Sequence, residues 1–116
     1  MAIPSKDDKV AIVSTGLEVV GYDMTDWLDS GELVAVGGVS VAAYSGVTIA
    51  NEARNSAAVV INGKSVAISK AAQFSITGQT TTGSTDGDAN YTFEVTVTSD
   101  GTPARVQTFE ARVQVV

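Results

Sequence analysis

Apolar and polar residues alternate over two stretches near the C-terminus. From Tyr91 to Thr98 every second residue is large and apolar, and residues 109–115 alternate between apolar side chains and Glu, Arg or Gln. A period of two is typical of a strand with one face on a core and the other in water. Asp100-Gly101 lies in the link, and an Asp-Gly pair readily adopts the positive backbone angles of a tight hairpin turn. The pattern predicts one long antiparallel hairpin over residues 89–116.

A second hairpin is predicted around Asn62-Gly63, another pair that suits a tight turn. Its strands are expected at residues 57–61 and 65–69. Residues 65–74 also have a weak helical pattern, so a helical turn there is an alternative. Further strands are predicted at residues 17–22, 32–36, 39–44, 46–50 and 73–77.

The stretch from Gly78 to Asn90 contains no large apolar residue and consists mainly of glycine, threonine and acids. We expect a long exposed loop there, because nothing in it offsets the entropy cost of ordering. Seven to nine short antiparallel strands with frequent turns predict an all-β fold, an immunoglobulin-like β-sandwich. Residues 11–116 would form this single domain, after an extended arm at residues 1–10. A jelly roll is the alternative, because residues 36–58 are rich in glycine and alanine.

The stretch from Gly21 to Val34 holds the only tryptophan and four acidic residues spaced three apart. A helix is disfavoured because Ser30-Gly31 would fall in its middle. We expect a strand ending near Met24, then a corner that buries Trp27 and Leu28 and leads into a turn. A backbone carbonyl across the sandwich would accept the indole N–H. The four carboxylates would face water: Asp23, Asp26, Asp29 and Glu32.

Composition removes several kinds of chemistry. The 116 residues suffice for one core, and they include no cysteine and no histidine, which excludes disulfides, thiolate metal sites and histidine-based triads. Seven scattered basic residues against thirteen acidic ones give a net charge of -6, which argues against a nucleic-acid partner. MAIPSKDDKV lacks the apolar run of a signal peptide, and no stretch approaches the roughly 18 apolar residues of a membrane span. We expect synthesis in a cytoplasm and no membrane partner.

The acidic loop predicted over residues 78–90 offers no convincing metal or catalytic site. Residues 86–90 have the alternating oxygen ligands that begin a calcium loop, but Tyr91 occupies the glycine position and Val97 the position of the closing glutamate. Ser84 stands one place early for a nucleophile elbow and has no histidine to activate it. Seven aromatic residues, most of them needed by the core, leave few for a carbohydrate-hydrolysing cleft. We therefore expect no enzyme activity, no metal and no cofactor.

Residues 89–93 resemble the start of strand F in immunoglobulin domains, with Tyr91 at the tyrosine-corner position and Phe93 in place of the second cysteine. With three further segments, this hairpin resembles the small immunoglobulin-like structural proteins encoded in the head and tail gene clusters of tailed bacteriophages. The resemblance extends from Tyr22 to Val115. Those further segments are Asp26-Trp27-Leu28, Ser30-Gly31-Glu32-Leu33-Val34 and Phe74-Ser75-Ile76-Thr77-Gly78.

The resemblance implies a virion component without enzyme activity, which either decorates the capsid or belongs to the neck or tail. Its partners would be the major capsid protein or other virion proteins, and a dimer or trimer is expected. Candidate partner contacts are Ile3 and Pro4 in the arm and Asp86 and Asp88 in the acidic loop. A carbohydrate- or cell-surface-binding module is the alternative from a different class.

Overall fold

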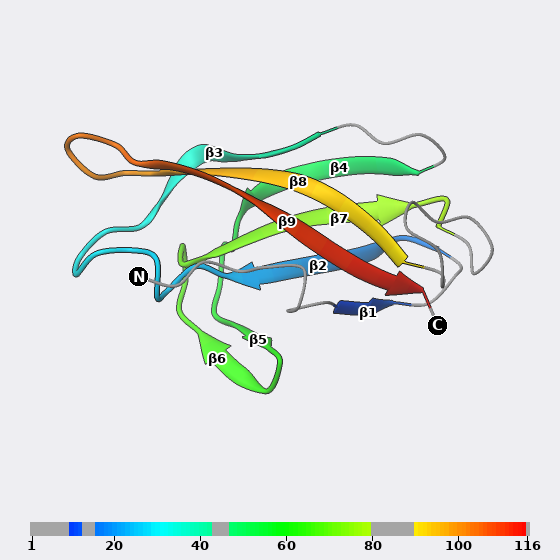
Figure 1. Cartoon of the computed structure of the whole chain (residues 1–116). Coiled ribbons are helices and arrows are strands. Elements are labelled where there is room, and N and C mark those ends of the chain that lie inside the picture. Colours follow the sequence, from blue (N-terminus) through cyan, green and yellow to red (C-terminus); the bar gives the residue numbers. More distant parts are fainter. Residues whose placement is uncertain (1–9, 13–15, 43–46, 80–89, 116) are drawn as a thin grey trace.

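The protein is an all-β sandwich, as predicted. The computed structural model describes residues 10–12, 16–42, 47–79 and 90–115, which contain nine strands and no helix (Figure 1). The strands are β1 (Val10–Ile12), β2 (Glu18–Asp23), β3 (Val34–Val41), β4 (Thr48–Arg54), β5 (Val59–Ile61), β6 (Lys64–Val66), β7 (Ala71–Thr77), β8 (Asn90–Ser99) and β9 (Val106–Val115).

Two sheets form the layers of the sandwich. One has the order β1-β9-β8-β3 and the other the order β2-β7-β4. Among the strands of the described ranges, β5 and β6 pair only with each other, and they project from the side (Figure 1). If β2, β3, β4, β7, β8 and β9 are equated with strands B, C, D, E, F and G, these are the two sheets of an immunoglobulin domain. This strand order favours the immunoglobulin-like prediction over the jelly roll.

The core lies between the sheets and follows the period-two pattern. Tyr91, Phe93, Val95 and Val97 of β8 are all buried and point to the same side. Phe93 meets Phe74 of β7 edge-on, with 5.9 Å between ring centroids. The ring that replaces the second cysteine of immunoglobulin domains therefore makes the contact between sheets, as the sequence predicts.

β1 departs from the prediction. It pairs with β9 in parallel, with Val10 opposite Val113 and Ile12 opposite Val115, whereas only antiparallel pairs are expected. The strand also begins at Val10, inside the segment assigned to the arm. A strand of three residues is too short to show a periodicity, and its partner lies at the far end of the chain.

The two hairpin turns differ in outcome. The β5–β6 turn is confirmed, because Asn62 and Gly63 alone connect the strands and have φ of 52° and 77°. The long β8–β9 hairpin is confirmed as well, but its tight turn is wrong: the link runs over residues 100–105, and neither Asp100 nor Gly101 has positive φ.

One strand, β3, replaces two of the predicted elements. Residues 32–36 and 39–44 were expected as separate strands, but β3 continues through the Gly37-Gly38 region as a bulge against β8. A Cβ on Gly38 would lie only 2.7 Å from the carbonyl oxygen of Thr98, so a larger residue would collide with the neighbouring strand.

The helical alternative at residues 65–74 is wrong, because β6, a turn and β7 occupy that stretch.

Asn55 joins the β5–β6 hairpin to the sandwich. Its side chain is fully buried, and its amide nitrogen donates to the carbonyl oxygens of Ala57 and Ala67, both at 2.9 Å. Its amide oxygen accepts from the backbone N–H of Ala71, also at 2.9 Å. One side chain thus satisfies three backbone groups where the chain leaves the sandwich, forms the hairpin and returns as β7.

We expect Asn55→Ala to lower the free energy of unfolding by about 3 kcal/mol, because three side-chain hydrogen bonds are lost, each with a net value of about 1 kcal/mol. Urea unfolding measures the change. Ser56→Ala, at the exposed neighbouring position, is the control and should cost less than about 0.5 kcal/mol. Equal effects of the two substitutions would contradict this role.

Candidate functional site

The corner between β2 and β3 forms largely as predicted. β2 ends at Asp23, and Trp27 and Leu28 are both buried. Asp23 caps the corner, because its carboxylate accepts from the backbone N–H of Thr25 at 2.9 Å and from its hydroxyl at 2.6 Å. The chain then turns back, with the N–H of Glu32 donating to the carbonyl of Asp29.

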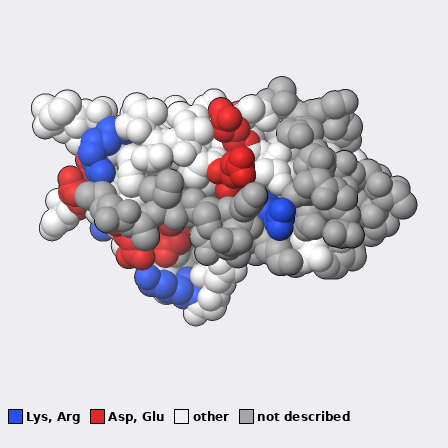
Figure 2. All heavy atoms as spheres, viewed as in Figure 1, with Lys and Arg blue, Asp and Glu red and all other residues white. Residues whose placement is uncertain are grey.

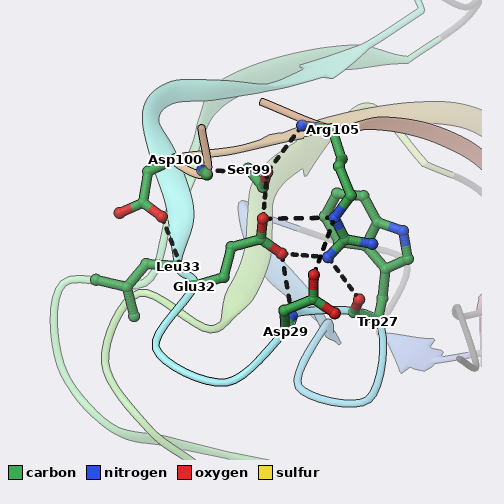
Figure 3. A network of polar contacts seen from close by, with 8 residues as sticks. Trp27, Asp29, Glu32, Leu33, Ser99, Asp100 and Arg105 are labelled. Carbon is green, nitrogen blue, oxygen red and sulfur yellow. Dashed lines mark hydrogen bonds and ion pairs between the residues drawn. The ribbon is translucent and has the colours of Figure 1, made fainter. Parts of the chain in front are cut away.

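Glu32 is a correction to the prediction that all four corner carboxylates face water. Asp26 and Asp29 are exposed, but Glu32 keeps only 8% of its surface and forms an ion pair with Arg105, in the link between β8 and β9 (Figure 3). A charge at this depth requires a partner, since burial without one is very costly. The partner is 73 residues away in sequence.

Three groups surround the Glu32 carboxylate, so it is well supplied with donors. Besides Arg105, the backbone N–H of Asp29 donates to it at 3.0 Å and the hydroxyl of Ser99 at 2.9 Å. The Ser99 hydroxyl in turn accepts from the backbone N–H of Arg105 at 2.9 Å. Ser99 therefore connects the carboxylate to the backbone of the β8–β9 link.

Arg105 also contacts the tryptophan of the corner. Its guanidinium carbon lies 4.6 Å from the Trp27 ring centroid, and its Nη2 donates to the Trp27 carbonyl oxygen at 2.8 Å. Its Nε is 3.8 Å from a carboxylate oxygen of Asp29. A cation over the face of an indole is attractive through the ring quadrupole. The expected carbonyl partner of the indole N–H is not found among the described residues, and this cation packs on the ring instead.

We call Trp27, Glu32, Ser99 and Arg105 the Arg105 cluster. The hydrogen bond from Arg105, with smaller contributions from the Asp29 N–H and the Ser99 hydroxyl, lowers the pKa of Glu32 from 4.5 to about 2, and burial opposes this only in part. The same hydrogen bond raises the pKa of Arg105. Both groups are therefore charged at neutral pH, and Glu32 holds its proton too weakly to act as a general acid or base there.

A second contact joins the same two loops. The N–H of Leu33 donates to the Asp100 carboxylate and the N–H of Asp100 donates to the Leu33 carbonyl oxygen, each at 2.8 Å. A Cβ on Gly101 would collide with the Glu32 carboxylate. The glycine of the Asp-Gly pair is thus needed for a close approach to Glu32, and not for the positive φ that the Asp-Gly pattern predicts.

Ser99 and Arg105 were not predicted as site residues from the sequence, although the sequence contains one signal for Ser99. It continues the inward positions of β8 after Tyr91, Phe93, Val95 and Val97, so the alternation places it on the core side. A hydroxyl at an inward position requires a hydrogen-bond partner. No comparable pattern identifies Arg105.

The residues proposed from sequence as partner contacts, Ile3, Pro4, Asp86 and Asp88, lie outside the described residues, as do most of the acidic loop and nearly all of the arm. Gln79, at the start of that loop, is buried and donates to the Gly16 carbonyl, so the loop begins inside the fold. Within the described ranges, no three acidic side chains form a group that could bind a metal ion.

Comparison with known proteins gives no match to a family model, a curated protein or a solved structure. The described part of the chain contains no helix long and apolar enough to cross a membrane. The resemblance to bacteriophage structural proteins therefore stays a prediction from the residues.

We expect acid to remove the stabilisation that Glu32 provides. Because folding lowers its pKa from 4.5 to about 2, the contribution is complete above pH 4.5 and is lost as pH falls toward 2. In Glu32→Gln this contribution is absent, so unfolding curves of variant and native protein should differ at neutral pH and converge in acid. Asp26→Asn, which removes an exposed carboxylate, should keep the native pH dependence. A constant offset between Glu32→Gln and the native protein would contradict the assignment.

Gly101→Ala should lower the free energy of unfolding by about 2 kcal/mol, because the added methyl group overpacks the space beside the Glu32 carboxylate. Thermal or urea unfolding measures this, with Thr102→Ala at an exposed position of the same link as the control. In a Glu32→Ala background the glycine substitution should cost little. An unchanged cost in that background would place its origin elsewhere.

Proposed function

We propose that the chain is a non-enzymatic structural protein of a bacteriophage virion, and that it decorates the capsid by binding the outer surface of the major capsid protein shell. The observation that carries the proposal is the Arg105 cluster. Its charged groups are used to hold two loops together, and Glu32 accepts from a guanidinium, a hydroxyl and a backbone N–H. The sandwich thus presents a preorganised end suited to binding.

The position of the cluster supports a contact role. It joins the β2–β3 and β8–β9 links, which correspond to the B–C and F–G loops that immunoglobulin variable domains use for recognition. Loops held in one conformation before binding lose less entropy on binding. A preorganised end therefore suits a protein of which many copies bind to one repetitive shell.

An apolar contact surface lies beside this end. Val36 of β3 and Val106 of β9 are 80% and 62% exposed, on strands that flank β8. Pro103 and Ala104 are exposed in the adjoining link. Figure 2 shows the protruding end of the β8–β9 hairpin, at the upper left, as an uncharged surface. We call Val36, Pro103, Ala104 and Val106 the hairpin-end surface and propose that it contacts the shell.

The burial of the aromatic rings supports the same structural role. Trp27, Tyr91 and Phe93 are buried, with 4%, 4% and 1% of their surface exposed, so these rings belong to the core. A carbohydrate-binding module would instead present aromatic rings to a sugar. The resemblance to bacteriophage head and tail proteins, the small size and the net charge of -6 agree with a virion component.

The test is binding of the purified protein to undecorated capsids, followed by sedimentation and electron microscopy. Val106→Lys should weaken binding at least about tenfold, since burying a valine is worth about 1.5 kcal/mol or more. Val60→Lys is the matched control, because it changes an equally apolar and exposed valine on β5, outside the hairpin-end surface. Equal binding by the two variants would exclude this surface, and a native protein that does not bind shells would exclude the capsid role.

Localisation on the particle separates the capsid role from a neck or tail role. A decoration protein should appear over the whole shell, whereas a neck or tail protein should appear at one vertex. Sedimentation equilibrium of the free protein tests the proposed dimer or trimer.

A further inference from the structure

The turn between β5 and β6 has an exposed asparagine followed by glycine. Asn62 and Gly63 are both exposed, and a Cβ on Gly63 would meet no atom of the described residues within 4 Å apart from its chain neighbours. An asparagine side chain can be attacked by the backbone nitrogen of the next residue, and a glycine in that place offers no steric hindrance. From the open surroundings of this pair we propose that Asn62 is a site of spontaneous deamidation.

The reaction needs only water. The Gly63 backbone nitrogen, after losing its proton, attacks the Asn62 side-chain Cγ, and ammonia leaves with the amide nitrogen. The product is a five-membered succinimide. Water then opens either of its two C–N bonds, giving an aspartyl residue or an isoaspartyl residue whose backbone runs through the side chain. One amide is exchanged for one carboxylate, and no oxidant or cofactor is required.

Attack requires the turn to leave its φ of 52° and 77° for a moment, and the hairpin offers little resistance. β5 and β6 have three residues each and, among the described strands, pair only with each other. Two-stranded hairpins are marginally stable alone, and such segments open locally at low free-energy cost.

Asn55-Ser56 shows the opposite situation in the same region. Asn55 is fully buried and its amide makes three hydrogen bonds to backbone groups, so its Cγ cannot turn toward the next nitrogen. Asn51, in β4, is followed by the larger Glu52, and its Nδ2 donates to the Ser75 hydroxyl at 3.1 Å. The fold thus leaves Asn62 reactive while it restrains two other asparagines.

The product would change how the hairpin sits on the sandwich. The isoaspartyl form lengthens the backbone inside a two-residue turn and disturbs the pairing of Ile61 with Lys64. Ile61 packs close over Gly21 of β2, where a Cβ would lie 3.3 Å from its Cδ1. The new carboxylate would also lie two residues from Lys64 in sequence, and Lys64 pairs with Asp23 at 3.8 Å. Deamidation should therefore loosen the hairpin from the outer face of β2.

The test follows both asparagines in one peptide. The folded protein is incubated at neutral and mildly alkaline pH and then digested with trypsin, which cleaves after Arg54 and Lys64 and releases residues 55–64. Mass spectrometry with fragmentation reads Asn55 and Asn62 separately, and a sample digested at time zero corrects for conversion during digestion. We expect conversion at Asn62, faster at higher pH, while Asn55 keeps its amide.

Two comparisons make the outcome decisive. The synthetic peptide 55–64, which has no fold, should convert at both asparagines. Asn62→Gly keeps a turn-compatible sequence and should abolish the modification without changing the melting temperature. Converted protein, separated by anion exchange, should show faster amide hydrogen exchange over residues 59–66 than the unconverted fraction. The proposal is overturned if Asn62 keeps its amide while the free peptide converts, or if Asn55 converts as fast in the folded protein.

Discussion

Aromatic rings carry the contact between the two sheets, without covalent support because the chain has no cysteine. Phe109 of β9 meets Tyr22 of β2 edge-on at 5.7 Å between centroids, and Phe93 of β8 meets Phe74 of β7 in the same way at 5.9 Å. The Tyr22 hydroxyl adds a hydrogen bond of 3.1 Å to the carbonyl oxygen of Arg112 in the opposite sheet. These contacts set the separation of the layers, and with it the positions of the links at their ends.

The Arg105 cluster depends on that separation. Glu32 lies in the link that follows β2, and Arg105 lies in the link that follows β8 of the other sheet. The two residues meet because both links emerge at the same end of the sandwich (Figure 3). A buried ion pair is weak evidence for stability, because desolvation offsets much of the attraction. Its clearer effect is geometric. Ser99 ties the carboxylate to the backbone that carries Arg105, so the two links share one arrangement.

Local features were predictable from the sequence and long-range pairings were not. The Asn62-Gly63 turn and the burial of Trp27 and Phe93 follow from short patterns, because turn chemistry and alternation act over a few residues. Glu32 was misplaced because its burial depends on a cation 73 residues away. Gly101 was assigned to the wrong cause for the same reason, since the atom that excludes a Cβ belongs to Glu32. The candidate site could therefore be located at its corner, but its chemistry could not.

The parallel pairing of β1 with β9 has a mechanical consequence. Val10 lies beside Val113 and Ile12 beside Val115, so the chain enters β1 at one end of this pair and leaves β9 at the other. A force that pulls the entering and leaving segments apart would slide the two strands lengthwise against each other. The hydrogen bonds between them would then share the load at once, whereas strands peeled from one end break their bonds one after another. This edge of the sandwich is therefore built to resist tension along its length.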